Sequence, residues 1–136
     1  MEKPRAQSWS EARALVRDEG NRYIIVKSLD EPDQHWEFPG GRMQANEATD
    51  DAVRRLCREQ LDVGVEILAT PPPFVYFARG RKVRYCYALC SVMAGAPQAV
   101  GCAEFRWVLG PRLCEFFFEP PTDQVVEWLR QQRPQD

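Results

Sequence analysis

The chain has 136 residues, of which 44% are hydrophobic and 28% are charged, and its formal net charge is −2. This length suits one domain with one core, over residues 1–136, and the nearly balanced charge gives no reason to expect a protein that binds nucleic acid or a membrane surface. We therefore expect any anionic ligand to be held by a local site. Composition carries no information on oligomeric state.

The sequence also lacks the signals of export. No run approaches the roughly 18 apolar residues of a membrane span, and the first residues lack the apolar core of a signal peptide. Five cysteines are present, an odd number without a CxxC pair, so neither a disulfide framework nor a zinc site is indicated. We expect a cytoplasmic protein with reduced, mostly buried thiols.

The first half of the chain begins with two β-like runs, at 12–18 and 22–28. Gly20 and Asn21 lie between them and tolerate positive φ, which predicts an antiparallel hairpin. A polar loop over 29–34 follows, and the stretch WEFPGG at 36–41 returns to extended structure.

A helix is predicted from Glu47 to Leu61. Apolar residues recur there at spacings of three and four, and Glu47, Asp50 and Asp51 occupy the expected first turn, where the helix dipole favours negative charge.

The second half predicts another hairpin, a short strand and a terminal helix. FVYFAR (74–79) and VRYCYALCSVM (83–93) are joined through Gly80, FRWVL (105–109) is strand-like, and PTDQVVEWLRQQ (121–132) is amphipathic with proline in its first turn. Two hairpins, a central helix and a terminal helix predict an α+β fold in which a mixed sheet lies between helices.

The segment from Gly41 to Val63 resembles the box of the Nudix family of MutT-like hydrolases. That box runs Gly, five residues, Glu, seven residues, then Arg-Glu-aliphatic-x-Glu-Glu-x-Gly-aliphatic. Counting from Gly41, Glu47 and Arg55 match in type and spacing. The WEFPGG lead-in, the aromatic hairpin, the tryptophan-containing strand and the terminal helix also follow the order seen in MutT proteins, so the resemblance covers nearly the whole chain.

The box departs from the family pattern at its glutamates. Leu56 stands at the first glutamate position, Glu59 at the second and Gln60 at the third. The resemblance implies hydrolysis of a nucleoside diphosphate linked to a group X, with Mg²⁺ neutralising the phosphates. Mg²⁺ prefers carboxylate and water oxygens, and positions 56, 59 and 60 share one helix face.

One carboxylate of the three therefore remains. The candidate catalytic residue is Glu59, and the candidate metal ligands are Glu59, the Gly40 carbonyl and Gln60. Mg²⁺ is expected to bind weakly, if at all, without phosphate oxygens to complete its shell. The alternatives are that Leu56 extends the apolar stripe of the helix and that Glu59 is a solvated helix residue. By the resemblance, Glu47 and Arg55 form a structural ion pair.

Other acids could contribute to the site. Asp62 or Glu104 could supply a substitute carboxylate, although Asp62 also suits a turn after the helix and Glu104 a surface loop. Asp123 falls where MutT proteins recognise a base, and it also suits a helix N-cap. Asp123 and Glu104 are the candidate substrate-binding residues. The basic tip at 79–84 either stacks on a nucleotide or is a solvated turn.

Three classes of function are consistent with these residues. The first is a Nudix hydrolase with a reduced metal site, and the second is a nucleotide-binding module without turnover. The third is a protein- or RNA-interaction domain that keeps only the fold. We expect a domain that binds a nucleotide or nucleotide derivative, with weak or absent hydrolysis.

Overall fold

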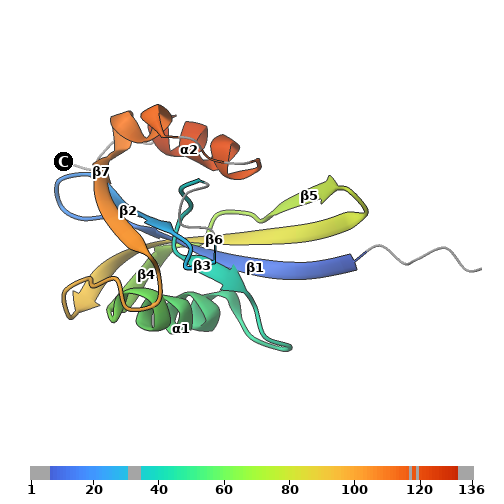
Figure 1. The fold of residues 1–136 in the computed structure, drawn as a ribbon, viewed down its shortest axis with the longest axis horizontal. Helices are drawn as coiled ribbons and strands as arrows, with labels where there is room; N and C mark the ends of the chain where they lie inside the picture. The colour runs from blue at the N-terminus through green and yellow to red at the C-terminus, as the bar shows by residue number, and fades with distance from the viewer. Residues whose placement is uncertain (1–6, 31–34, 117, 119, 132–136) are drawn as a thin grey trace, which may run out of the picture.

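A computed structural model describes residues 7–30, 35–116, 118 and 120–131 (Figure 1). Residues 31–34 of the expected polar loop and residue 132 of the expected terminal helix lie outside this range. The strands are β1 (Gln7–Val16), β2 (Arg22–Lys27), β3 (Gly40–Arg42), β4 (Gly64–Ala69), β5 (Phe74–Ala78), β6 (Arg81–Ala94) and β7 (Glu104–Leu109). The helices are α1 (Thr49–Leu61), the 3-10 helix η1 (Gly110–Glu115) and α2 (Thr122–Gln131).

The larger sheet has the order β3-β1-β6-β4, with β5 also paired to β6. β1 and β6 run parallel, and every other pair in this sheet is antiparallel. β2 and β7 form a second, antiparallel pair. The sheet is therefore mixed, as predicted.

The predicted hairpin between the first two runs is wrong. β1 already has β3 on one edge and β6 on the other, so no edge is left for β2. A turn does form, in which the Asp18 carboxylate accepts the N–H groups of Gly20 and Arg22 at 3.0 and 2.8 Å. One bridge, between Arg17 and Tyr23, joins the two runs before β2 leaves to pair with β7.

The central helix begins two residues later than predicted. α1 starts at Thr49, so Asp50 and Asp51 are the acidic residues of its first turn. Glu47 precedes it in a turn, where its N–H donates to Gln44 and Asn46 has a φ of 62°. Ala52, Val53, Leu56, Cys57 and Leu61 form its buried face, as their spacing predicts.

The second predicted hairpin is confirmed. β5 and β6 pair with Ala78 opposite Arg81, and Arg79 and Gly80 take positive φ at the turn. The predicted strand and terminal helix are also present as β7 and α2, with Val125, Val126 and Leu129 buried.

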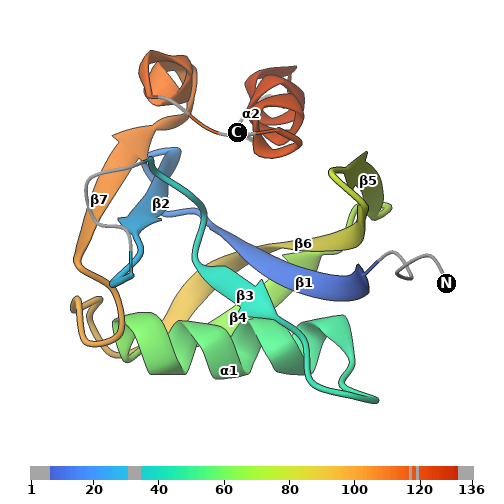
Figure 2. The ribbon, with the colours of Figure 1, turned by 45° about the vertical axis from the view of Figure 1, so that its right-hand side comes forward.

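The strands lie between α1 and α2 (Figure 2). Two apolar cores fill the space on either side of them, one beside α1 and one beside α2. Alternation along β2 divides its side chains, since Ile24 and Val26 join the core beside α1 whereas Tyr23 and Ile25 join the core beside α2. The predicted α+β fold, a mixed sheet between helices, is confirmed. No helix in the described ranges is long and apolar enough to cross a membrane. Four cysteines are buried free thiols, and the fifth, Cys114, is exposed.

Candidate functional site

The glycine segment before α1 lies tightly against β1. Gly40 pairs with Arg13, and Gly41 pairs with Ala12. A Cβ at position 40 would overlap the carbonyl oxygen of Ala12, so the close approach of the two strands requires glycine there. This packing holds the Gly40 backbone at the face of α1.

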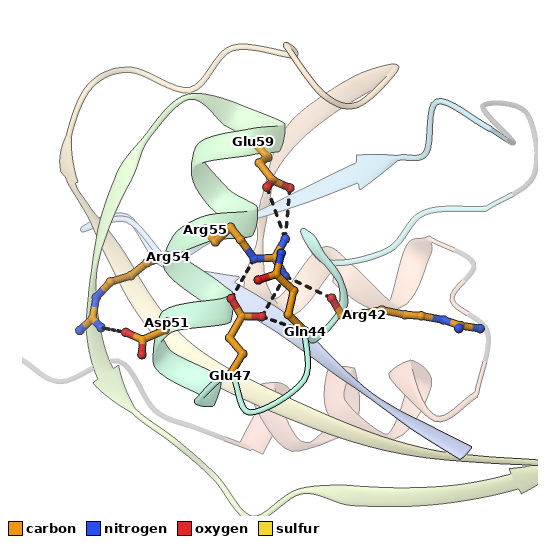
Figure 3. A network of polar contacts seen from close by, with 7 residues as sticks. All are labelled: Arg42, Gln44, Glu47, Asp51, Arg54, Arg55 and Glu59. Carbon is orange, nitrogen blue, oxygen red and sulfur yellow. Dashed lines mark hydrogen bonds and ion pairs between the residues drawn. The ribbon is translucent and has the colours of Figure 1, made fainter. Parts of the chain in front are cut away.

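Glu47 and Arg55 form a two-pronged ion pair (Figure 3). Arg55 Nε donates to one carboxylate oxygen at 2.8 Å and Nη2 donates to the other at 2.9 Å. Arg55 Nη2 also donates to the carbonyl of Arg42 at 3.2 Å, and Glu47 accepts the N–H of Gln44 at 3.0 Å. The hydrogen bonds from Arg55 and then from Gln44 lower the pKa of Glu47 to about 2. This cluster ties the loop before the helix to the helix itself.

The three positions of the box glutamates have different surroundings. Leu56 is 6% exposed and belongs to the core beside α1. The Glu59 side chain is 57% exposed, and its carboxylate lies 3.3 Å from Arg55 Nη1. Glu59 therefore lies at the solvent, beside the Glu47–Arg55 pair (Figure 3).

Gln60 makes two hydrogen bonds to Gly40. Its Nε2 donates to the Gly40 carbonyl at 2.7 Å, and its Oε1 accepts the Gly40 N–H at 3.1 Å. The amide thus joins α1 to β3 through both polar groups of one residue. The carbonyl proposed as a metal ligand is already engaged by a neutral donor.

The other acids that the sequence suggested, Asp62, Glu104 and Asp123, each have contacts of their own. Asp62 is the C-cap of α1, with a φ of 55°, and lies 3.6 Å from Arg58. Glu104 is the first residue of β7 rather than part of a loop, because it pairs with Lys27, and it accepts from Arg106 at 3.1 Å. Asp123 is the second residue of α2, not its N-cap, and accepts the N–H of Gln124 at 2.9 Å.

A cleft of about 380 Å³ opens beside Gly40 and Gln60. None of Asp62, Glu104, Asp123 or Glu59 lines it. The residues that line it and were predicted as site residues are Gly40, Gly41 and Gln60. The charged residues that also line it but were not singled out in the sequence are Glu11, Arg13, Asp30, Glu37 and Arg42.

Arg13 is the buried cation of this cleft. It contacts Glu11 at 2.6 Å and Glu37 at 3.4 Å, and it donates to the carbonyl of Phe38 at 3.0 Å. Burial disfavours its charge, but the two carboxylates outweigh burial and raise the pKa of Arg13. Opposite charges two residues apart, and so on the same face of β1, were the sequence signal for this pair.

Arg42 lies at the exposed side of the cleft. Its guanidinium stacks over the Trp9 ring at 4.0 Å, and Trp9 Nε1 donates to Glu11 at 2.9 Å. In Figure 3 the Arg42 side chain points away from the Glu47–Arg55 pair. Stacking leaves the guanidinium N–H groups free to meet an anion.

The residues around Gly40 do not fit the metal site that the box implies. Leu56 supplies no ligand, Glu59 faces Arg55, and Gln60 Nε2 presents N–H groups where a cation would need oxygen lone pairs. Across the described ranges, no group of three or more His, Cys, Asp or Glu side chains could hold a metal ion.

The whole fold matches known proteins. Residues 9–129 match the NUDIX domain family, so the chain belongs to this family. No curated protein matches the chain in a sequence search.

Several solved structures share the fold. The E. coli ORF135 protein has a TM-score of 0.77 at 21% identity, with 96% of each chain covered. The MutT protein of Methanosarcina mazei has a TM-score of 0.77 at 16% identity, with 93% of this chain and 96% of that chain covered. A UDP-X diphosphatase has a TM-score of 0.72 at 11% identity, with 95% of this chain and 66% of that chain covered. The chain is thus a NUDIX domain similar in fold to these proteins.

Proposed function

We propose that this NUDIX domain binds a nucleoside-diphosphate-linked ligand in the cleft beside Gly40, and that it hydrolyses phosphoanhydrides weakly or not at all. The observation that carries the proposal is the pair of hydrogen bonds from Gln60 to Gly40, at 2.7 and 3.1 Å. A neutral amide there holds the backbone of the box without a cation.

The ligand class is supported by the cleft and by the exposed Arg42. Arg42 stacks on Trp9 at the exposed side, where a guanidinium can pair with phosphate oxygens. Arg13 has a different role, because Glu11, Glu37 and the Phe38 carbonyl already occupy its donors. The similarity in fold to MutT and to a UDP-X diphosphatase favours the same ligand class.

The expectation of weak hydrolysis follows from charge. Hydrolysis of a phosphoanhydride gathers negative charge on phosphoryl oxygens, which must be stabilised as it develops. Losing one such contact commonly costs ~10²–10³ in rate, and two of the three box carboxylates are absent here. Any Mg²⁺ is expected to arrive with the phosphates rather than to reside in the protein.

The test combines thermal stabilisation with product release. Nucleoside triphosphates, dinucleotides and nucleotide sugars are added in turn, with Mg²⁺, and the melting temperature and the release of monophosphate or phosphate are measured. We expect one ligand class to raise the melting temperature with little release. Rapid metal-dependent release would show a hydrolase. The absence of both stabilisation and release would favour an interaction domain that keeps only the fold.

Four variants test where the ligand binds. Arg42→Ala should weaken the stabilisation, whereas Arg54→Ala, which removes an exposed arginine paired with Asp51 on α1, should not. Asp123→Asn and Glu104→Gln test whether these two acids, which do not line the cleft, contact the ligand, Asp123 through its base. Stabilisation that survives Arg42→Ala unchanged would contradict ligand binding in this cleft.

A further inference from the structure

The β5–β6 hairpin carries positive charge that its surroundings do not balance. No aspartate or glutamate occurs between Glu66 and Glu104. The cations in that stretch are Arg79, Arg81, Lys82 and Arg84. All four are exposed, and none forms an ion pair with any residue that the structure describes.

Three other exposed arginines differ from these four. Arg22, Arg106 and Arg112 each contact a carboxylate, at distances of 2.7, 3.1 and 2.9 Å. The protein as a whole has a net charge of −2, so the hairpin is a local region of positive potential on a slightly acidic molecule. An acidic partner would be attracted to this hairpin.

The outer edge of β5 is open. β5 pairs with β6 along one edge, and no backbone hydrogen bond joins its other edge to the described part of the chain. In Figure 1 the hairpin extends away from the two helices, with β5 on its outer side. The unpaired N–H and C=O groups of such an edge are a template for another strand.

One face of the hairpin combines apolar and charged side chains. Val75 is 48% exposed and Phe77 is 69% exposed. They lie opposite Arg84 and Lys82 in the register of the pair, so all four project from the same face. Lys82 Nζ lies 5.9 Å from the centroid of the Phe77 ring, which places its charge over β5. An added strand would therefore find apolar surface with cations above it.

We propose that the open edge of β5 binds an acidic segment of another protein, in extended conformation, as an additional strand. Its backbone pairs with β5, its apolar side chains pack beside Val75 and Phe77, and its carboxylates face Lys82 and Arg84. Two copies of this chain would bring like charges together at the same edge, which disfavours self-association. A nucleic-acid strand would use the cations but would leave the backbone edge unpaired.

The binding experiment uses a short synthetic peptide in which valine and glutamate take turns at every second position, with threonine between them, so that both kinds of side chain lie on one face of the added strand. The peptide is labelled with fluorescein and capped at both ends. Fluorescence anisotropy measures its affinity for the full chain, and hydrogen exchange measures the protection of amides 74–78. We expect binding together with increased protection of β5. The same peptide N-methylated at alternate residues keeps its charge but loses backbone donors, and it should bind much more weakly.

Matched charge reversals test whether the peptide binds at the β5–β6 hairpin. Lys82→Glu with Arg84→Glu should weaken binding by about tenfold or more, because two exposed ion pairs are replaced by repulsion. Arg54→Glu with Arg130→Glu changes the net charge equally at exposed sites of α1 and α2 and should leave the affinity unchanged. Unchanged melting temperatures of both double variants establish that they fold.

Four results of the binding measurements would overturn the proposal. They are no binding of the peptide, equal binding of the N-methylated peptide, tighter binding of single-stranded oligothymidylate than of the peptide, and equal loss of affinity in the two double variants. Dimerisation of the wild type that protects amides 74–78 would assign the edge to a second copy and would also contradict it.

Discussion

The box region and the β5–β6 hairpin use their polar groups in opposite ways. Around Gly40 the amide of Gln60, the guanidinium of Arg13 and the carboxylate of Glu47 all have partners within the protein. On the hairpin, the cations from Arg79 to Arg84 have no carboxylate partner in the described ranges. The polar groups of the box region hold one another in place, whereas the cations of the hairpin are left available for a partner.

The largest loss of stability is expected at Arg13. Arg13→Met leaves the carboxylates of Glu11 and Glu37 without their cation in a site where the arginine side chain is 12% exposed. Unfolding by urea should show that the free energy of unfolding falls by about 3 kcal/mol. The control Arg54→Met removes an exposed pair and should change stability by less than ~1 kcal/mol. Equal losses in both variants would show that Arg13 is not a structural cation.

The next largest effect is expected at Gln60. Gln60→Met is similar in size but leaves both polar groups of Gly40 without their partner, which should cost about 2 kcal/mol in the same assay. Gln44→Met, at an exposed position whose side chain has no such bond, should change stability by less than ~0.5 kcal/mol. If Gln60→Met left the free energy of unfolding unchanged, the Gly40 segment would be held by β1 alone.

A smaller effect, visible as a pH dependence, is expected at Glu47. Its folded pKa of about 2 lies below the ordinary 4.5, so its stabilising contribution is complete above pH 4.5 and is lost as the pH falls toward 2. The melting temperature of the wild type should therefore fall more steeply over this range than that of Glu47→Gln. Asp51→Asn, which removes an exposed carboxylate, should keep the wild-type slope. Equal slopes for wild type and Glu47→Gln would contradict the pairing with Arg55.

The smallest effect is expected at Glu59. Its carboxylate is 57% exposed and lies 3.3 Å from an arginine that keeps Glu47 as its main partner. Glu59→Gln should change the free energy of unfolding by less than ~0.5 kcal/mol. A larger loss, measured by urea unfolding, would show that Glu59 belongs to the structural cluster rather than to the solvent-exposed side of α1.

Spacing rules predicted most of the fold. The helical period located α1 to within two residues, and Gly80 between two apolar runs located the β5–β6 turn. The hairpin between β1 and β2 was predicted wrongly because pairing of long strands depends on which edges are free. β3 and β6 occupy both edges of β1, and no local sequence signal reveals that.

Less of the candidate site than of the fold could be predicted from the sequence. The box spacing pointed to Gly40, Glu47, Arg55 and Gln60, but the two hydrogen bonds of Gln60 join residues 20 positions apart. The partners of Arg13 likewise depend on how residues 37 and 38 pack beside β1. Such contacts are set by tertiary packing and not by local pattern.

The central claim, that Gln60 holds Gly40 in place of a cation, is tested most directly by Mg²⁺ titration. Isothermal titration calorimetry without nucleotide compares the wild type with Leu56→Glu/Gln60→Glu, and with Leu56→Gln as an uncharged control. We predict no measurable Mg²⁺ binding by the wild type or the control, and clear binding by the double variant, because three carboxylates then share one face of α1. Tight Mg²⁺ binding by the wild type would contradict the account.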